Sequence, residues 1–353
     1  MNASAPWKVF AASVRGATHV RKQLPNQDAC HFDVGTDGAP PIFIAVSDGH
    51  GSERCFRSDV GSRLAVETAL TECRACLEGL RAASPTEIKD TVERRFLGHL
   101  VRAWRRRIAQ HADEHPFTAE EIARVAGNVS PPAANGLSDE QVVHAYGATL
   151  LVLMLTEQFA LYLQLGDGEM LVVTESPGRG SPSELFAEVS RPLPRDESLI
   201  ANETTSLCRD DAERQFRVRL QVFDAEPPAL ILICTDGYSN AFESPDGFEQ
   251  VGGDMLRVLR EQGVEAVAQG FADELDHVSR VGSGDDVTVA VVFRDNSRTG
   301  EPSRENSDDP FFFSPTIELA NTPQEAPTVI VPPTLAEPDP EFTTHTIPTD
   351  GHG

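Results

Sequence analysis

Short, continuous apolar runs dominate the pattern of the chain, and they predict buried β-strands. Runs rich in β-branched and aromatic residues cover positions 7–14, 30–34, 41–47, 148–156, 159–165, 170–174, 229–234 and 287–293. Several of these runs end at, or begin from, an aspartate beside a glycine, as in Ser47-Asp48-Gly49-His50-Gly51. The pattern therefore predicts a β-rich core whose strand ends carry polar groups.

Three longer stretches place apolar residues at helical spacing and predict helices that face this core. They cover residues 58–80, 85–111 and 248–278. The second stretch also carries a run of arginines, which we interpret as a solvated helix face. These arginines are Arg102, Arg105, Arg106 and Arg107. Residues 15–22 form a predicted basic loop, and this local reversal of sign in an acidic chain could receive an anion.

The composition is that of a globular, acidic protein. The 353 residues are 40% hydrophobic, enough for a sizeable core, and carry a formal net charge of -25. Nucleic acid backbones and anionic membranes would be repelled, so we expect neither as a partner. The first ten residues do not resemble a signal peptide and no run is long enough to span a membrane, which predicts a cytoplasmic protein. Six scattered cysteines indicate reduced thiols.

The character of the chain changes after residue 294. We predict one domain over residues 1–294 and a tail rich in proline, threonine and acidic residues over 295–353. Hydrophobic periodicity vanishes in the tail, which predicts disorder. Its threonine-rich segments, such as Thr322-Pro323, are predicted targets of a partner serine/threonine kinase.

Aspartates beside glycines or at strand ends recur in five places. They are Asp28, Asp48, Asp167, Asp236 and Asp285. Each of them alone also fits a polar turn after a core strand. Together, and without a matching set of cysteines, they indicate converging oxygen ligands, which favours Mg²⁺ or Mn²⁺ over zinc. Two such ions can activate a shared water for phosphoester hydrolysis, and His50 is then a candidate general acid.

The ordered set of motifs resembles the type 2C metal-dependent protein serine/threonine phosphatases, the PPM family, and within it a bacterial branch. The motifs are NQD at 26–28, VSDGHG at 46–51, YGAT at 146–149, LGDG at 165–168, TDG at 235–237 and GSGDDVT at 282–288. The resemblance spans roughly residues 7–294. It implies an α+β fold, a four-layer α-β-β-α sandwich of two antiparallel sheets flanked by helices, with metals at one end.

Carried over residue by residue, the resemblance implies two Mn²⁺ or Mg²⁺ ions per active site and a third, weakly bound ion. The implied metal ligands are Asp28, Asp48, Gly49, Asp167, Asp236 and Asp285. In this scheme Asp48 bridges the two ions and Gly49 offers its carbonyl to the first, while Asp28 acts mostly through bound water. Asp236 and Asp285 hold the second ion.

Two further roles follow from the same resemblance. Asp167 matches the residue that binds the third ion, and His50 matches the general acid of the family. Asp286 occupies a position where the family accepts Asn or Asp, so it stays outside the implied ligand set. The acidic residue that usually precedes Asp28 is replaced by Gln27, which removes one charge near the first ion.

The arginine that usually grips the substrate phosphate is not at its usual spacing. His19, Arg21 and Lys22 are the available cations. Arg21 has the better chemistry, because a guanidinium can hold phosphate through two parallel hydrogen bonds. His19 has the resemblance to the bacterial branch, and we expect both residues to bind substrate phosphate.

The sequence therefore predicts a hydrolase, a metal-dependent protein serine/threonine phosphatase. Its expected reaction is attack of a metal-bridging hydroxide on phosphoserine or phosphothreonine in proteins, with His50 as the general acid. The alternative is a pseudophosphatase, a regulatory binding module that has lost turnover, which Gln27 and the missing arginine favour. We expect phosphorylated proteins as partners and a monomer.

Overall fold

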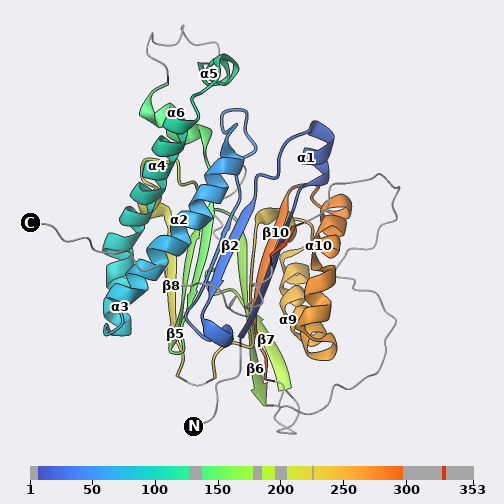
Figure 1. Cartoon of the computed structure of the whole chain (residues 1–353). Helices are drawn as coiled ribbons and strands as arrows, with labels where there is room; N and C mark the ends of the chain where they lie inside the picture. Colours follow the sequence, from blue (N-terminus) through green and yellow to red (C-terminus); the bar gives the residue numbers. More distant parts are fainter. Residues whose placement is uncertain are drawn as a thin grey trace, which may run out of the picture.

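Two antiparallel β-sheets form the centre of the molecule (Figure 1). The computed structural model describes residues 7–126, 137–177, 185–194, 205–224, 226–296 and 328–330. Sheet A has the strand order β11 (Thr328–Ile330), β1 (Trp7–Val14), β10 (Val287–Arg294), β9 (Leu230–Cys234), β6 (Glu169–Pro177) and β7 (Leu185–Ser190). Sheet B has the order β2 (Ala29–Val34), β3 (Ile42–Ser47), β4 (Leu150–Leu155), β5 (Phe159–Leu165) and β8 (Arg217–Val222).

Helices cover the outer face of each sheet, so the molecule has four layers (Figure 1). Sheet B is covered by α2 (Ser58–Gly79), α3 (Pro85–Thr91) and α4 (Leu97–Glu114). Sheet A is covered by α9 (Pro245–Gln262) and α10 (Val264–Val281). Shorter helices are α1 (Ala17–Lys22), α5 (Ala119–Ala126), α6 (Asp139–Ala145), α7 (Ala212–Gln215) and α8 (Asp236–Ser239). The predicted α-β-β-α sandwich is confirmed.

The continuous apolar runs are explained by burial on both faces. Along β3, Ile42, Ile44 and Val46 face the other sheet, while Phe43 and Ala45 pack under the helices of sheet B. All six residues of β3 are buried. Successive side chains of a strand point to opposite faces, so a strand between two apolar layers cannot alternate with polar residues.

Three local predictions need correction. The predicted basic loop at 15–22 is largely helix α1. The single helix predicted over 248–278 is two helices, because Gly263 has a φ of 83° and ends α9. The stretch 85–111 is helical throughout, but a π-helical turn at Val92–Phe96 separates α3 from α4.

The predicted disorder of the tail falls largely outside the described residues. Within 295–353 the structure describes 295–296 and β11. Strand β11 pairs antiparallel with β1, where Ala11 faces Ile330 and Ser13 faces Thr328. All six cysteines carry free thiols, as predicted. Among the described residues, no helix has the length and apolar character that a membrane span requires.

Antiparallel pairing brings the ends and beginnings of neighbouring strands to one end of the sandwich. Ser47, the last residue of β3, pairs with Ala29 at the start of β2. Cys234, the last residue of β9, pairs with Val289 near the start of β10 and with Glu169 at the start of β6. The residues just outside these pairs include the aspartates singled out from the sequence, which therefore gather at one edge.

Candidate active site

Three aspartates from three different segments converge at this end of the sandwich. Asp48 follows β3, Asp167 lies in the turn between β5 and β6, and Asp236 is the first residue of α8, directly after β9. One ligand oxygen from each lies within 4.8 Å of the others. The group is only partly buried, so a solvent ion can reach it.

The charges of this cluster oppose one another. Burial raises the pKa of Asp48 well above its ordinary value, and the nearby carboxylates of Asp28, Asp236 and Asp285 raise it further. Burial, with Asp167 and Asp285 nearby, raises the pKa of Asp236 to about 7. A divalent cation would relieve this repulsion, and hard carboxylate oxygens are the ligands that Mg²⁺ and Mn²⁺ prefer. The donor set therefore fits the implied metal.

Hydrogen bonds and one close backbone approach fix the positions of these carboxylates. The Asp48 N–H donates to Thr149 Oγ1 at 2.9 Å, and the Thr149 N–H donates to the Asp48 carbonyl at 2.8 Å. Asn240 Nδ2 donates to Asp236 Oδ2 at 3.0 Å. Gly237 lies against the Asp286 carbonyl, where a Cβ atom would overlap it. The glycine of the Thr235-Asp236-Gly237 motif thus allows two acidic segments to approach each other.

Asp28 and Gly49 lie beside this cluster. Asp28 is buried and accepts a hydrogen bond from Thr235 Oγ1 at 2.8 Å. Burial and the neighbouring Asp286 raise the pKa of Asp28 well above its ordinary value. The Gly49 N–H donates to the Gln27 carbonyl at 3.0 Å, so the loop after β3 is tied to the start of β2.

A second group of possible ligands consists of His19, Asp285 and Asp286. Asp286, which is 3% exposed, accepts a hydrogen bond from Gly16 N and, through Oδ2, from Gln27 N. Its Oδ2 also lies 2.7 Å from His19 Nδ1. The hydrogen bond with Asp286 raises the pKa of His19 despite the burial of the ring. Asp285 Oδ1 lies 3.7 Å from His19 Nε2, which places this imidazole beside an implied metal ligand.

Sequence reasoning missed the role of Asp286. The available signal was the position of Asp285 and Asp286 directly before a fully buried strand. Successive side chains point to opposite faces, so one of these two aspartates is expected to point into the protein. Asp285, in contrast, keeps half of its side chain exposed.

His50 lies next to the aspartate cluster, on the side of α6. Its N–H donates to the Gly147 carbonyl at 3.0 Å. Burial lowers the pKa of His50, an effect that Asp167 partly offsets. The influence of Asp167 shows that the imidazole lies near the predicted ligands.

The remaining predicted residues lie in more ordinary surroundings. Arg21 is exposed, and its Nη2 donates to Thr18 Oγ1 at 2.9 Å. Lys22 is exposed at the end of α1. Gln27 is 7% exposed, donates through Nε2 to Ser58 Oγ at 2.7 Å, and keeps its buried Oε1 without a hydrogen-bond partner.

Converging carboxylates at the end of a two-sheet sandwich are the arrangement that the resemblance to metal-dependent phosphatases implies. A family profile described as "Protein phosphatase 2C" matches residues 15–276. The chain therefore belongs to the protein phosphatase 2C family, whose members are metal-dependent protein phosphatases. The predicted family and enzyme class are confirmed. A search of curated protein sequences gives no significant match.

Solved structures of bacterial phosphatases are similar to this chain. The catalytic domain of the serine/threonine protein phosphatase PstP, solved in complex with two manganese ions, is 16% identical, with a TM-score of 0.45 over 81% of this chain and 97% of that one. PppA, a type VI secretion regulator from Pseudomonas aeruginosa, is 19% identical, with a TM-score of 0.45 over 82% and 98%. Stp1 from Staphylococcus aureus is 11% identical, with a TM-score of 0.46 over 83% and 97%.

Proposed function

We propose that this protein hydrolyses phosphoserine and phosphothreonine monoesters in proteins at a dinuclear Mn²⁺ or Mg²⁺ site. The observation that carries the proposal is the convergence of Asp48, Asp167 and Asp236 within 4.8 Å. Membership of the protein phosphatase 2C family supports the reaction type.

The proposed ligands of the two ions are Asp48, Asp236, Asp285 and the Gly49 carbonyl, with Asp28 acting through bound water and Asp167 serving a third, weaker ion. When bound, the ions supply an activated water and the positive charge that offsets the phosphoryl oxygens. The chain's own task is to hold the carboxylates in place, which Thr149 and Asn240 do through the hydrogen bonds described above.

We assign the substrate phosphate to His19 more than to Arg21. Asp286 favours the protonated form of His19 and fixes its ring through Nδ1, which leaves Nε2 directed toward the Asp285 side. A cationic imidazole held in this way can donate to a phosphoryl oxygen. Arg21 is exposed on α1, two positions further along the chain, and would add a second, more flexible contact.

His50 is the proposed general acid for the leaving alkoxide. It lies beside the carboxylates, and its ring packs against Gly147, where a Cβ atom would lie 2.8 Å from His50 Cδ2. A rigid position next to the reacting phosphoryl group is what proton transfer requires.

Turnover of a phosphothreonine peptide against Mn²⁺ concentration tests the proposal. The wild-type protein should show metal-stimulated hydrolysis, and Asp48→Ala and Asp236→Ala should abolish it. Asp254→Ala, which removes an exposed aspartate on α9, is the matched control and should keep wild-type turnover. Retained activity in either cluster variant would show that the metal assignment is wrong.

Calorimetric titration with Mn²⁺ separates the enzyme from the pseudophosphatase alternative. Binding without turnover on any phosphopeptide would indicate a regulatory binding module. Absence of both binding and turnover would rule out metal-dependent phosphatase chemistry in this chain.

A further inference from the structure

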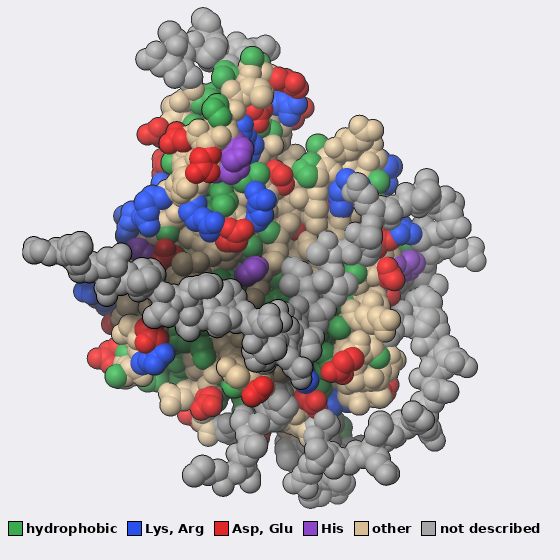
Figure 2. Space-filling model, in the orientation of Figure 1, with side chains coloured by type: hydrophobic (Ala, Val, Ile, Leu, Met, Phe, Trp, Pro, Cys, Tyr) green, Lys and Arg blue, Asp and Glu red, His purple; other side chains and the backbone are tan. Residues whose placement is uncertain are grey.

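Three arginines lie on one face of α4. Arg102, Arg105 and Arg106 stand at positions i, i+3 and i+4, which are neighbours on a helix surface. Across the described residues, no carboxylate forms an ion pair with any of them, whereas Arg107 pairs with Glu67 of α2. Lys and Arg side chains gather on the side of the molecule formed by α4 (Figure 2).

The absence of acidic partners among the described residues contrasts only with the overall composition of the chain. The sequence contains 55 acidic and 30 basic residues, so carboxylates are in excess. Arg102 and Arg106 are exposed, and Arg105 is partly buried. Arg105 Nη2 donates to the Arg209 carbonyl at 2.6 Å, and its Nε is buried without a hydrogen-bond partner. The sequence analysis interpreted this helix face as solvated. The partly buried, hydrogen-bonded Arg105 shows that only part of the face is exposed to solvent.

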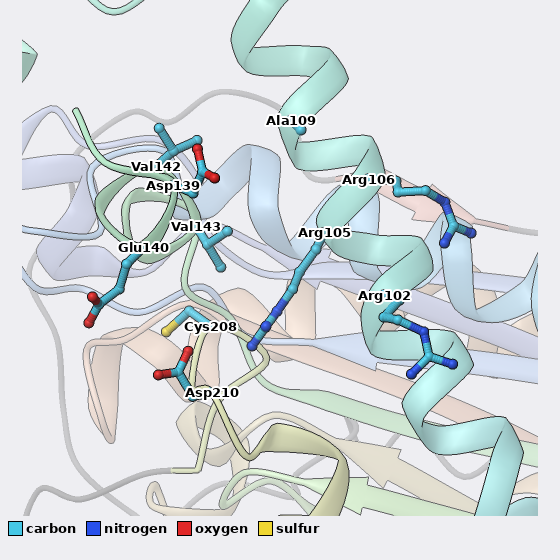
Figure 3. Close-up of a pocket in the computed structure, with 10 residues that line it drawn as sticks. All are labelled: Arg102, Arg105, Arg106, Ala109, Asp139, Glu140, Val142, Val143, Cys208 and Asp210. Carbon is cyan, nitrogen blue, oxygen red and sulfur yellow. The ribbon is translucent and has the colours of Figure 1, made fainter. Parts of the chain in front are cut away.

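The three arginines line a pocket of about 600 Å³ between α4, α6 and residues 208–210 (Figure 3). This volume lies within the range of ligand-binding pockets. Ala109, one turn beyond Arg106, keeps the α4 side open, while Val142 and Val143 of α6 supply apolar surface. We call this cavity the α4 pocket.

The opposite side of the α4 pocket is acidic. Asp139 and Glu140 of α6 and Asp210 lie across from α4 (Figure 3). Arg105 points toward Asp210, whereas Arg102 and Arg106 extend from the side of α4 that faces away from α6 (Figure 3). An anionic ligand is therefore attracted to α4 and repelled from α6, so it must lie along the arginine side. A segment with acidic side chains on the edge toward the arginines and apolar groups on the edge toward Val142 and Val143 fits this lining.

The α4 pocket adjoins the candidate active site through Gly147. A Cβ atom at Gly147 would lie 2.8 Å from His50 Cδ2 and 3.3 Å from Cys208 Sγ. Cys208 also lines the α4 pocket. The pocket and His50 thus lie on either side of the buried Gly147 and Cys208, within reach of one peptide segment.

We propose that the α4 pocket binds aspartate and glutamate side chains that flank the phosphorylated residue of a protein substrate. This inference rests on the proposed phosphatase function. Nucleic acid is a poorer fit, because the net charge of -25 would repel a long polyanion, whereas a short acidic segment meets only the local field.

The test compares two phosphothreonine peptides that differ only in three flanking residues, all glutamate or all glutamine. The full chain with Mn²⁺ should turn over the glutamate peptide with a kcat/KM about three- to tenfold higher, the size expected for two partly exposed ion pairs. Arg102→Gln/Arg106→Gln should remove this preference and leave turnover of para-nitrophenyl phosphate unchanged. Arg94→Gln/Arg95→Gln removes the same charge from exposed positions of the preceding helical stretch and should retain the preference.

A binding measurement separates this inference from the proposed function. Fluorescence anisotropy with a labelled, unphosphorylated glutamate peptide needs no turnover, and the Arg102/Arg106 variant should bind it about three- to tenfold more weakly than wild type. Equal turnover of both peptides by the wild type, or equal binding by wild type and variant, would overturn the α4 pocket assignment. Tighter binding of a single-stranded oligonucleotide than of the peptide would overturn it too. Peptide binding without hydrolysis of any phosphoester would overturn the proposed function instead.

Discussion

Asp286 joins three segments that are far apart in the sequence. One carboxylate accepts hydrogen bonds from the backbone of Gly16 and Gln27 and contacts the His19 ring. A buried carboxylate is tolerated only when its oxygens are satisfied, and this one has a partner for each. Its position therefore sets the start of α1, the start of β2 and the orientation of the proposed phosphate-binding imidazole.

Removing these contacts should be costly. We expect Asp286→Ala to lower the free energy of unfolding by about 3 kcal/mol, because it leaves two buried N–H groups and an imidazole unpaired. Urea unfolding in the presence of a chelator measures this change. Asp285→Ala, which removes the neighbouring and half-exposed carboxylate, should change it by less than about 1 kcal/mol. Equal losses in both variants would contradict the role given to Asp286.

The proposed general-acid role of His50 predicts that the effect of replacing it depends on the leaving group. His50→Asn should reduce kcat on a phosphothreonine peptide by about 10²- to 10⁴-fold, because the alkoxide needs a proton. The same variant should lose far less on para-nitrophenyl phosphate, whose leaving group is stable as an anion. Steady-state kinetics on both substrates measures the difference, and an equal loss on both would show that His50 acts by another route.

At the scale of residues, the sequence predicted which side chains are candidate metal ligands better than it predicted the contacts that hold them. Asp48, Asp167 and Asp236 could be found because each follows a recognisable strand and sits beside a glycine. The contacts of Asp286 could not, because they depend on how α1 and β2 approach the start of β10. A contact across about 270 positions of sequence leaves no local pattern.

Among the elements, the side chain of Arg57 links α5 to the end of the sandwich that carries the candidate active site. Arg57, at the start of α2, donates to both carboxylate oxygens of Glu121 and to the carbonyls of His115 and Pro116. Its guanidinium also lies 4.0 Å from the centre of the Phe117 ring. The same side chain donates to Tyr146 Oη at 2.8 Å, close to the Gly147 backbone that contacts His50.

The attachment of α5 should depend on pH. The hydrogen bond from Arg57 lowers the pKa of Glu121 from 4.5 to about 2. Because the folded-state pKa is the lower one, this contribution to stability is fully present above pH 4.5 and is lost as the pH falls toward 2. Hydrogen-exchange protection of α5 should fall across that window in the wild type.

Glu121→Gln should remove this pH dependence and lower the protection at neutral pH. Glu120→Gln changes the neighbouring residue, which pairs with Arg124 within α5, and should keep the wild-type profile. A profile in Glu121→Gln that matches the wild type would show that another group controls the attachment.

The helices also show where periodicity fails. Helical spacing located the apolar faces of α9 and α10 but not their separation, since both pack on sheet A and continue one hydrophobic pattern. The break depends on the backbone of Gly263, and a glycine inside a helical pattern is equally compatible with a continuous helix. The strands were easier to locate from the sequence, because burial on both faces of a sheet gives long apolar runs.

Across the whole molecule, the site connects the two sheets. Asp48 follows β3 of sheet B, while Asp236 and Asp285 flank β9 and β10 of sheet A. Without a cation, burial and the neighbouring carboxylates raise the pKa of Asp48 and of Asp236. The end of the sandwich proposed as the active site thus carries mutually repelling carboxylates.

Metal binding should therefore stabilise the folded protein as well as support the proposed reaction. At a Mn²⁺ concentration of 100 times Kd, the free energy of unfolding should rise by about 2.7 kcal/mol. In chelator, the raised pKa of Asp236, about 7, means that stability present below pH 4 is lost as the pH rises to 7. Differential scanning calorimetry measures both effects.

The variant Asp48→Asn tests whether charge repulsion in the cluster destabilises the metal-free protein, because it removes one negative charge while keeping the shape of the side chain. In chelator at pH 8 this variant should melt at a higher temperature than the wild type, and it should gain less from Mn²⁺. A lower melting temperature in chelator would contradict the repulsion described for the cluster.

The overall architecture was predictable from the family resemblance, and the four layers agree with it. Composition and periodicity alone indicated a β-rich core with flanking helices but not the pairing of β1 with β10. That pairing joins the first and last strands of the predicted domain, and no pattern in either strand specifies a partner about 280 residues away.

The pairing of β1 with β10 also has a practical consequence for protein engineering. Trp7 pairs with Arg294, while Val14 pairs with Val287 next to the acidic cluster. At about 3.4 Å per residue, Trp7 and Arg294 lie roughly 24 Å from that end. A short linker that replaces residues 1–6 and 295–353, and with them β11, would join them, and new chain ends can be opened in a surface turn such as that between β4 and β5. The resulting circular permutant would keep every proposed ligand in place.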